Sequence, residues 1–375
     1  MKEFCKNVWG RCRQVSLTDR QRRWWILALV CLCLAGGLSA ISSVIQKRLP
    51  SQQMVQRWDA EGGSAQISCF FADGSDVVPN TIRAFEYTLS NQLKEASIKA
   101  PKESARLWVD AYSAKGKITL ASNRTSVQVG AYGVGGDYFL FHPLQLEQGS
   151  MYFDGDDLMQ DQVILDQNTA WQLFGSYDIA GQPITIGTGP MAHIGVVAGV
   201  IESENGWMNE QAGAAAGTVY LSYEMLDRYG THSGINAYEI VMPDPIRGFA
   251  RGMVADHIGF SEDQIQIVEN SSRYSFVSLW KILGQFGTRS MNTKAIIYPY
   301  WENAARGWED VLSLLLLIQM LLLIQPAVLL IVVLWRLWKC HRPRWSDLRD
   351  WLQRHREAQW ARQAAKHADK STMTQ

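Results

Sequence analysis

Two long uncharged runs of apolar residues constrain this chain more than any other feature. The first is Trp24–Ile45 and the second is Val311–Trp335. Each is as long as the roughly 20 residues that an α-helix needs to cross the hydrocarbon core of a bilayer. A buried core helix is the alternative for either run, and a cleaved signal peptide is a further alternative for the first. We expect two transmembrane helices, at residues 24–45 and 311–335, in a multi-pass membrane protein.

The charges of the chain are divided between its ends and its middle, although the formal net charge is zero. Residues 1–23 hold seven Lys and Arg against two Asp and Glu, and residues 336–375 hold ten against four. Because Lys and Arg collect on the cytoplasmic side of membrane segments, both termini are predicted to be cytoplasmic. Residues 46–310 are then extracytoplasmic, and the protein is placed in the cell (plasma) membrane. The basic residues do not form one strip for phosphates, so we expect no nucleic acid as a partner.

The sequence does not contain the motifs that carry common catalytic and cofactor chemistry. It has no phosphate-binding loop for ATP, and the glycine-rich Gly133–Tyr138 lacks dinucleotide-binding spacing. The acidic Asp154–Asp157 lacks the ligand spacing of a calcium loop, and the histidines between the apolar runs lack the spacing of metal ligands. We therefore predict that the chain is not an enzyme and has no catalytic, cofactor-binding or metal-binding residues. An external enzyme on a membrane anchor is the weakest of the hypotheses.

The segment between the apolar runs alternates strand-like and helix-like patterns. Pro79–Ala96 places apolar residues at helical spacing, and strand-like runs precede and follow it. Further along, Asp166 can cap a short helix that Gly175 closes, and a strand is expected directly afterwards. Such an order is typical of α+β domains. We predict an α+β extracytoplasmic domain flanked by two transmembrane α-helices.

Small and polar residues within the apolar runs are candidates for helix packing. Gly36 and Ala40 are four residues apart in the first run, which lets another helix approach closely. Gln319 and Gln325 are amides in the second run and can hydrogen-bond to neighbouring helices. The two spans of one chain could pack together, or these residues could contact further helices in a larger assembly.

The basic termini carry apolar residues that suggest contact with lipid or protein. Residues 336–375 contain a predicted basic amphipathic helix, with Leu348, Trp351 and Leu352 on one face. This helix could lie on the inner leaflet or dock on a cytoplasmic partner, and the three residues are candidates for cytoplasmic coupling. Residues 1–23 could form an interfacial helix or a disordered basic tail.

The stretch Val163–Glu202 resembles the MacB-like periplasmic core domain family. The resemblance lies in a helix end, a turn and a final apolar run, and residues 136–157 upstream also resemble that family. The matching residues are Ala170, Leu173, Phe174 and Gly175 in the helix end, Asp178 and Gly181 in the turn, and Val197, Gly199 and Val200 in the run.

The resemblance implies a permease subunit of a mechanotransmitting ABC transporter. In such a system a separate cytoplasmic ATPase moves the membrane helices, and stalks pass this motion to the external domain. The external domain would comprise a porter-like part at about 46–130 and 235–275, an inserted small α/β subdomain at about 131–234, and a stalk helix at about 272–310. Family permeases usually have four spans, whereas this sequence has two long apolar runs.

Two functions follow as predictions. The first is a non-catalytic permease-like subunit whose partners are membrane lipid, a separate ABC ATPase and a second permease or further copies of itself. The alternative is a two-span membrane receptor, sensor or accessory protein with an extracytoplasmic ligand-binding domain. The small number of spans and the C-terminal amphipathic helix motivate this alternative.

Overall fold

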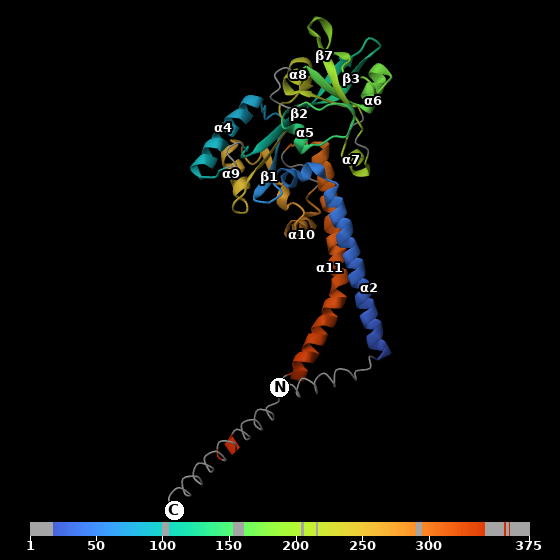
Figure 1. Cartoon of the computed structure of the whole chain (residues 1–375), viewed down its shortest axis with the longest axis vertical. Helices are drawn as coiled ribbons and strands as arrows, with labels where there is room; N and C mark the ends of the chain where they lie inside the picture. Colours follow the sequence, from blue (N-terminus) through green and yellow to red (C-terminus); the bar gives the residue numbers. More distant parts are fainter. Residues whose placement is uncertain are drawn as a thin grey trace, which may run out of the picture. The chain divides into compact units, whose positions relative to one another are not determined.

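The computed structural model describes most of the chain, and the described residues fall into two compact units. The described residues are 18–99, 105–152, 161–203, 206–214, 217–289, 295–341, 356–357 and 360. One unit comprises Met1–Leu38 with Ile318–Gln375, and the other comprises Ser39–Leu317. The second unit contains the mixed α/β domain, shown in Figure 1.

Eleven strands of the described residues form one sheet, in which the order along the main path is β11-β1-β10-β2-β3-β8-β5-β7-β4. The β3–β8 and β5–β7 pairs are parallel, and the other pairs are antiparallel. The strands are β1 (Ser64–Phe71), β2 (Val109–Ala121), β3 (Ser126–Gly136), β4 (Leu146–Gly149), β5 (Gln162–Asp166), β6 (Pro183–Ile186), β7 (His193–Ile201), β8 (Thr218–Ser222), β9 (Thr231–His232), β10 (Ala237–Pro243) and β11 (Ile265–Glu269). The division into a porter-like part and an inserted subdomain stays a prediction.

Helices precede, separate and follow the strands. The α-helices are α3 (Met54–Trp58), α4 (Pro79–Glu95), α5 (Tyr138–Phe141), α6 (Gln167–Phe174), α7 (Trp207–Gln211), α8 (Tyr223–Tyr229), α9 (Phe249–His257) and α10 (Phe276–Gln285). Three 3₁₀ turns among the described residues are η1 (Pro50–Gln52), η2 (Gly189–Met191) and η3 (Asn270–Ser272). The α+β class expected from the sequence is confirmed.

The central strands are buried on both faces, because successive side chains of a strand point to opposite sides of the sheet. On β1, Ile67 and Cys69 join one apolar cluster, whereas the intervening Phe70 joins the other. Helices α4 and α9 pack together beside β1 and cover the first face (Figure 1). The side of α4 that faces the sheet carries the buried residues Ile82, Phe85, Leu89 and Leu93. These are the residues whose helical spacing is visible in the sequence.

The helix at residues 167–174 forms as the sequence predicts. The side chain of Asp166 accepts a hydrogen bond from the backbone N–H of Thr169 at 3.0 Å, which satisfies one of the free donors at the start of α6. Gly175 ends the helix with φ of 70°, a conformation that glycine adopts without steric cost. Strand β6 follows eight residues later.

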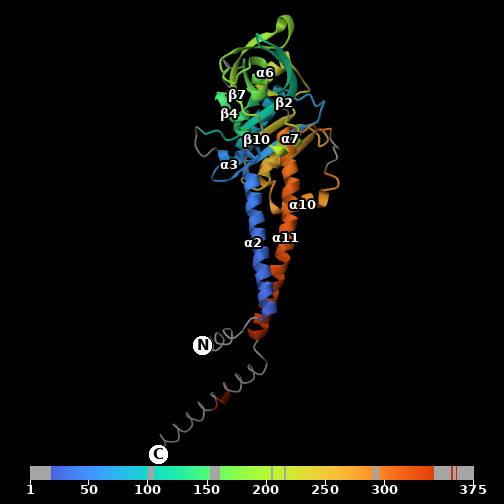
Figure 2. The ribbon, with the colours of Figure 1, turned by 90° about the vertical axis from the view of Figure 1, so that its right-hand side faces the viewer.

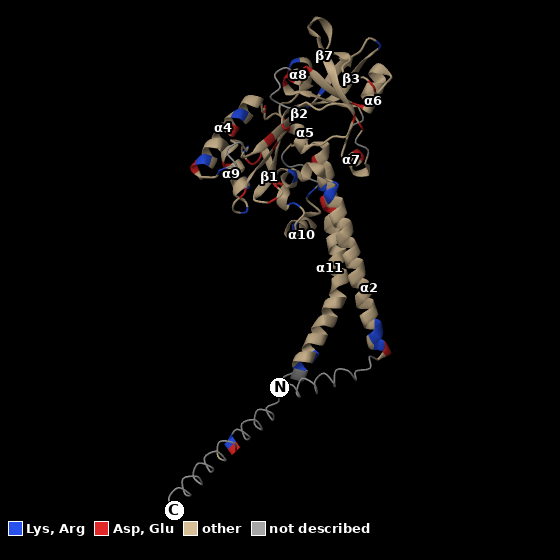
Figure 3. Ribbon diagram, in the orientation of Figure 1, with Lys and Arg blue, Asp and Glu red and all other residues tan. Residues whose placement is uncertain are grey.

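Two long apolar helices precede and follow the strands of the domain in the sequence. They are α2 (Asp19–Lys47) and α11 (Tyr300–His341), with mean hydropathies of 2.2 and 2.7 in their most apolar windows. They contain the two predicted spans, and Figure 3 shows that charged residues occur toward their ends. Within the domain unit, Ile45 of α2 and Leu312 of α11 belong to one apolar cluster. The two candidate membrane helices predicted from the sequence are therefore present.

The predicted stalk helix at about 272–310 is divided in the structure. Residues 276–285 form α10, and α11 starts only at Tyr300, directly after Pro299. Proline disfavours helical conformation in the residue before it, so a new helix begins after Pro299 rather than continuing through it. Figure 2 shows α10 beside the first part of α11.

Asp110 on β2 makes the stability of the domain depend on pH. It is only 6% exposed, and burial, followed by the charge of Glu86, raises its pKa to about 8. An aspartate in the unfolded chain has a pKa of about 3.9. Between these values the folded state holds a proton that the unfolded state has lost, so stability falls as the pH rises from about 4 to about 8.

We expect Asp110→Asn to remove most of this pH dependence. At pH 9 the variant should be more stable than the wild type by about 2–4 kcal/mol, since one pKa unit corresponds to about 1.4 kcal/mol. At pH 4 the two proteins should unfold alike. Thermal unfolding of the full chain in detergent at both pH values measures the difference. Asp256→Asn, at an exposed position on α9, is the control and should leave the pH profile unchanged. Parallel profiles for wild type and Asp110→Asn would contradict the assignment.

Candidate functional site

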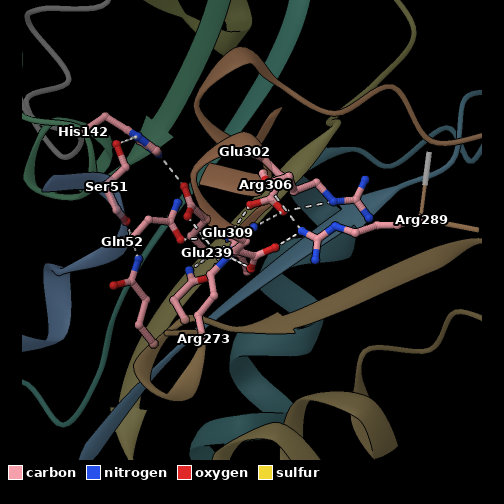
Figure 4. Close-up of polar contacts among 12 residues, drawn as sticks. Ser51, Gln52, His142, Glu239, Arg273, Arg289, Glu302, Arg306 and Glu309 are labelled. Atoms are coloured by element: carbon pink, nitrogen blue, oxygen red, sulfur yellow. Dashed lines mark hydrogen bonds and ion pairs between the residues drawn. The ribbon is translucent and has the colours of Figure 1, made fainter. Parts of the chain in front are cut away.

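A network of buried charged side chains holds the start of α11 against the domain (Figure 4). Arg273, which follows η3, is 5% exposed and lies at its centre. Its Nη1 and Nη2 donate to the two carboxylate oxygens of Glu302 at 2.6 and 2.8 Å, and its Nε donates to Glu309. Glu302 and Glu309 are seven residues apart, about two turns of helix, so they share one face of α11. One guanidinium therefore contacts two residues of α11 that lie about two turns apart.

Two further arginines surround this centre. Arg289 donates to Glu309, and its Nε lies 3.2 Å from a carboxylate oxygen of Asp310. Nε of Arg306 lies 3.8 Å from Oε1 of Glu302, and the guanidinium of Arg306 lies 4.1 Å from the centre of the Tyr298 ring. The acidic residues at the start of α11 are thus neutralised by arginines from the preceding segment and from α11 itself.

The network continues from Arg273 into the sheet. Asn270 accepts from Arg273, and its Nδ2 donates to Oγ of Ser68 on β1 at 2.6 Å. Oγ of Ser68 donates to Glu239 on β10 at 2.7 Å. Glu239 in turn pairs with Nε2 of His142. A continuous series of buried polar contacts therefore links α11 to two central strands.

The network also reaches the segment that follows α2. Oε1 of Gln52, in η1, accepts a hydrogen bond from Arg273 at 2.9 Å. Oγ of the neighbouring Ser51 lies 3.0 Å from Nδ1 of His142. Both long helices are therefore connected to the sheet through the same group of side chains, α2 through the η1 turn and α11 directly.

The charged form of Arg273, at the centre of the network, is favoured by its partners. Burial by itself lowers the pKa of Arg273, but the charge and hydrogen bonds of Glu302 raise it above the ordinary arginine value. Burial lowers the pKa of Arg289. Buried charges are tolerated when they are paired and hydrogen-bonded, and removing one partner leaves the other uncompensated.

An aromatic cluster fixes the first turn of α11 next to this network. Trp301 is 5% exposed, and its ring centre lies 4.4 Å from that of His142 and 5.3 Å from that of Tyr132 on β3. Tyr300 packs edge-on against Trp301 at 5.2 Å. Any displacement of the α11 start relative to the sheet has to break these contacts or carry the sheet with it.

The sequence pattern did not identify this network. Its members come from seven separated segments, and the largest group close together in sequence contains Glu302, Arg306 and Glu309. Their spacing of four and three residues places them on one helical face just before the second apolar run. This cluster was the signal available in the sequence, but Arg273, its main partner, lies outside that stretch.

The structure gives the surroundings of some of the packing residues that were predicted in the spans. In the unit that contains both spans, Nε2 of Gln325 on α11 donates to the backbone oxygen of Trp24 on α2 at 3.2 Å. Ala28 and Ala35 are buried, whereas a methyl group at Gly36 would meet no atom within 4 Å among the described residues.

The contacts predicted for the other candidate residues remain predictions. Ala40 is exposed and Gln319 half-buried. Together with Gly36 they stay candidates for contact with a further helix. The coupling candidates Leu348, Trp351 and Leu352 lie outside the described residues.

The chain belongs to the MacB-like periplasmic core domain family, whose model matches residues 35–246, more than half of the 375 residues. The match includes Ser51, His142 and Glu239 but ends before Arg273 and α11. The network therefore joins the family domain to the segment that follows it.

The chain is also similar to curated relatives and to solved structures. The macrolide export ATP-binding/permease proteins MacB of Neisseria gonorrhoeae and of Neisseria meningitidis serogroup A are 37% identical over 81 residues. This match covers 21% of the chain and only 12% of the length of each relative. The periplasmic region of MacB from Actinobacillus actinomycetemcomitans is 14% identical, covers 61% of this chain and 95% of that one, and has a TM-score of 0.38. The extracellular domain of the noncanonic ABC-type transporter YknZ from Gram-positive bacteria is 16% identical, with coverages of 54% and 99% and a TM-score of 0.34.

Proposed function

We propose that this chain is a non-catalytic, permease-like subunit of a mechanotransmitting ABC transporter system. A separate cytoplasmic ATPase would move α2 and α11, and the extracytoplasmic domain would follow. Membership of the MacB-like family supports this proposal. The observation that carries it is the buried contact of Arg273 with Glu302 and Glu309, which ties the start of α11 to the domain. In this proposal, ATP hydrolysis takes place on the separate cytoplasmic subunit.

The topology that this function requires has both termini in the cytoplasm. Arg20, Arg22 and Arg23 lie in the first turns of α2, and Arg336 and Lys339 lie near the end of α11. Basic residues at these ends favour the cytoplasmic side. The domain between the two helices is then extracytoplasmic, and the protein is a multi-pass protein of the cell membrane.

Helix α10 supports the location of the protein in a membrane. Its buried residues Leu279 and Ile282 pack with Leu312, which lies in the second apolar run. Its opposite side exposes Phe276, Val277 and Trp280 among other large apolar side chains. A helix with an exposed apolar face, packed at the start of a membrane span, is suited to the lipid interface, where tryptophan is favoured. We place this face of α10 in the outer leaflet.

A fluorescent label at position 277 should report this contact with lipid. Val277→Cys, labelled with an environment-sensitive dye in a cysteine-free full chain, should show a blue-shifted emission after reconstitution into vesicles. Tyr87→Cys on α4, where the native side chain is 71% exposed, is the control and should report water. Equal, water-like spectra at both positions would contradict the placement of α10.

Copurification tests the proposed function. The full chain, tagged and extracted from its native membrane in mild detergent, should carry an ABC ATPase with it. Replacing Leu348, Trp351 and Leu352 together with serine should release that ATPase, whereas replacing the neighbouring Arg349 should not. Recovery of the wild type as a homodimer alone, with no ATPase or second permease, would contradict the proposal.

A two-span receptor is the second candidate function, and a cavity beside the network favours it. In a receptor, the C-terminal amphipathic helix would carry the signal to a cytoplasmic partner. Deleting residues 343–375 should then abolish the output and leave assembly in the membrane intact. Loss of assembly in this deletion would count against the receptor.

A further inference from the structure

A cavity of about 340 Å³ lies where the η1 turn, the α7 region and the start of α11 meet. This volume is in the range of small-molecule binding sites. Its walls include Arg48, Ser51, Glu202, Asn209, Tyr300 and Trp301. These residues come from the segment after α2, from the end of β7, from α7 and from α11. A molecule bound in the cavity would therefore touch the connections of both long helices.

The cavity presents both signs of charge. Arg48 and Glu202 both line it, and neither takes part in an ion pair among the described residues. A guanidinium binds a carboxylate through charge-assisted hydrogen bonds, and a carboxylate binds an ammonium group in the same way. The two side chains together suit a ligand that carries one charge of each sign.

Neutral polar groups also line the cavity. The hydroxyl groups of Ser51 and Ser203 and the amide of Asn209 add further polar groups to the walls.

We propose that this cavity binds a small zwitterion of amino-acid or dipeptide size. The ligand carboxylate would contact Arg48, and its ammonium group would contact Glu202. This inference goes beyond the proposed function, because binding requires no ATPase. Trp301 and Ser51 both contact His142, so the bound zwitterion would lie directly against the buried network.

Calorimetry on the full chain in detergent tests the charge requirement. The probes are the dipeptide Gly-Leu, its N-acetyl derivative and its C-terminal amide. Gly-Leu should bind saturably, and each blocked derivative should bind at least tenfold more weakly, because each has lost one of the two charges. Failure of Gly-Leu to bind at millimolar concentration, or equal affinity for all three probes, would overturn the proposal. Neither result bears on copurification with an ATPase.

Single substitutions assign each charge to its partner. Glu202→Gln should remove the discrimination against the N-acetyl derivative and keep that against the amide, whereas Arg48→Gln should do the reverse. Glu224→Gln, at an exposed position on α8, is the matched control and should bind all probes like the wild type. If Glu202→Gln and Arg48→Gln both retained the wild-type discrimination, the assignment would be wrong.

Discussion

Replacing Arg273 with methionine is expected to lower the free energy of unfolding of the domain by about 3–5 kcal/mol, the cost of breaking a buried ion pair from one side. The substitution keeps the apolar stem and removes the charge. Glu302 and Glu309, both buried, then lose their main cationic partner. Denaturant unfolding of the full chain in detergent measures the loss.

Two comparison variants separate the charge effect from general damage. Arg251→Met replaces an exposed arginine on α9 and should change stability by less than about 0.5 kcal/mol, as surface substitutions usually do. Combining Arg273→Met with Glu302→Gln and Glu309→Gln should recover part of the loss, because no uncompensated charge is then buried. If the combined variant lost as much stability as the three single variants lose in total, the network would not act as a unit.

Replacing Trp301 with alanine should have an effect of similar size for a different reason. The substitution removes a large buried aromatic side chain that packs against His142 and Tyr132, and such truncations cost about 3–5 kcal/mol. The loss should be accompanied by weaker attachment of the α11 start to the sheet. Hydrogen exchange of the amides at residues 300–306 should therefore speed up more than that of β1.

An exposed tryptophan provides the control for this variant. Trp171 on α6 is 57% exposed and contacts Tyr177 at the surface, so Trp171→Ala should cost less than about 1 kcal/mol. Equal losses from Trp171→Ala and Trp301→Ala would contradict the idea that the α11 start is anchored by the buried aromatic cluster.

Local patterns were enough to predict several elements of the fold. The two uncharged runs predicted α2 and α11, because the length of an apolar run is a local property. The helical spacing from Ile82 to Leu93 predicted the buried face of α4, and Asp166 with Gly175 predicted the ends of α6. Each of these features depends on residues within a few turns of one another.

The candidate site could not be predicted in the same way. Arg273 meets Gln52 more than two hundred residues away in sequence, and His142 meets Glu239 across the sheet. No periodicity encodes such pairs. The parallel β3–β8 and β5–β7 pairs were likewise not visible, since strand pairing depends on how the whole chain folds. The break before α11, which the predicted stalk helix missed, had a local sequence signal at Pro299.

Accessibility of single cysteines to a membrane-impermeant maleimide tests the central claim most directly. In a cysteine-free full chain, Asn123→Cys reports on the exposed turn between β2 and β3, and Ser371→Cys reports on the C-terminus. In right-side-out vesicles, the cysteine at position 123 should be labelled at once, and that at position 371 only after permeabilisation. Labelling of both positions under the same condition would place the domain and the C-terminus in one compartment and contradict a two-span permease-like subunit.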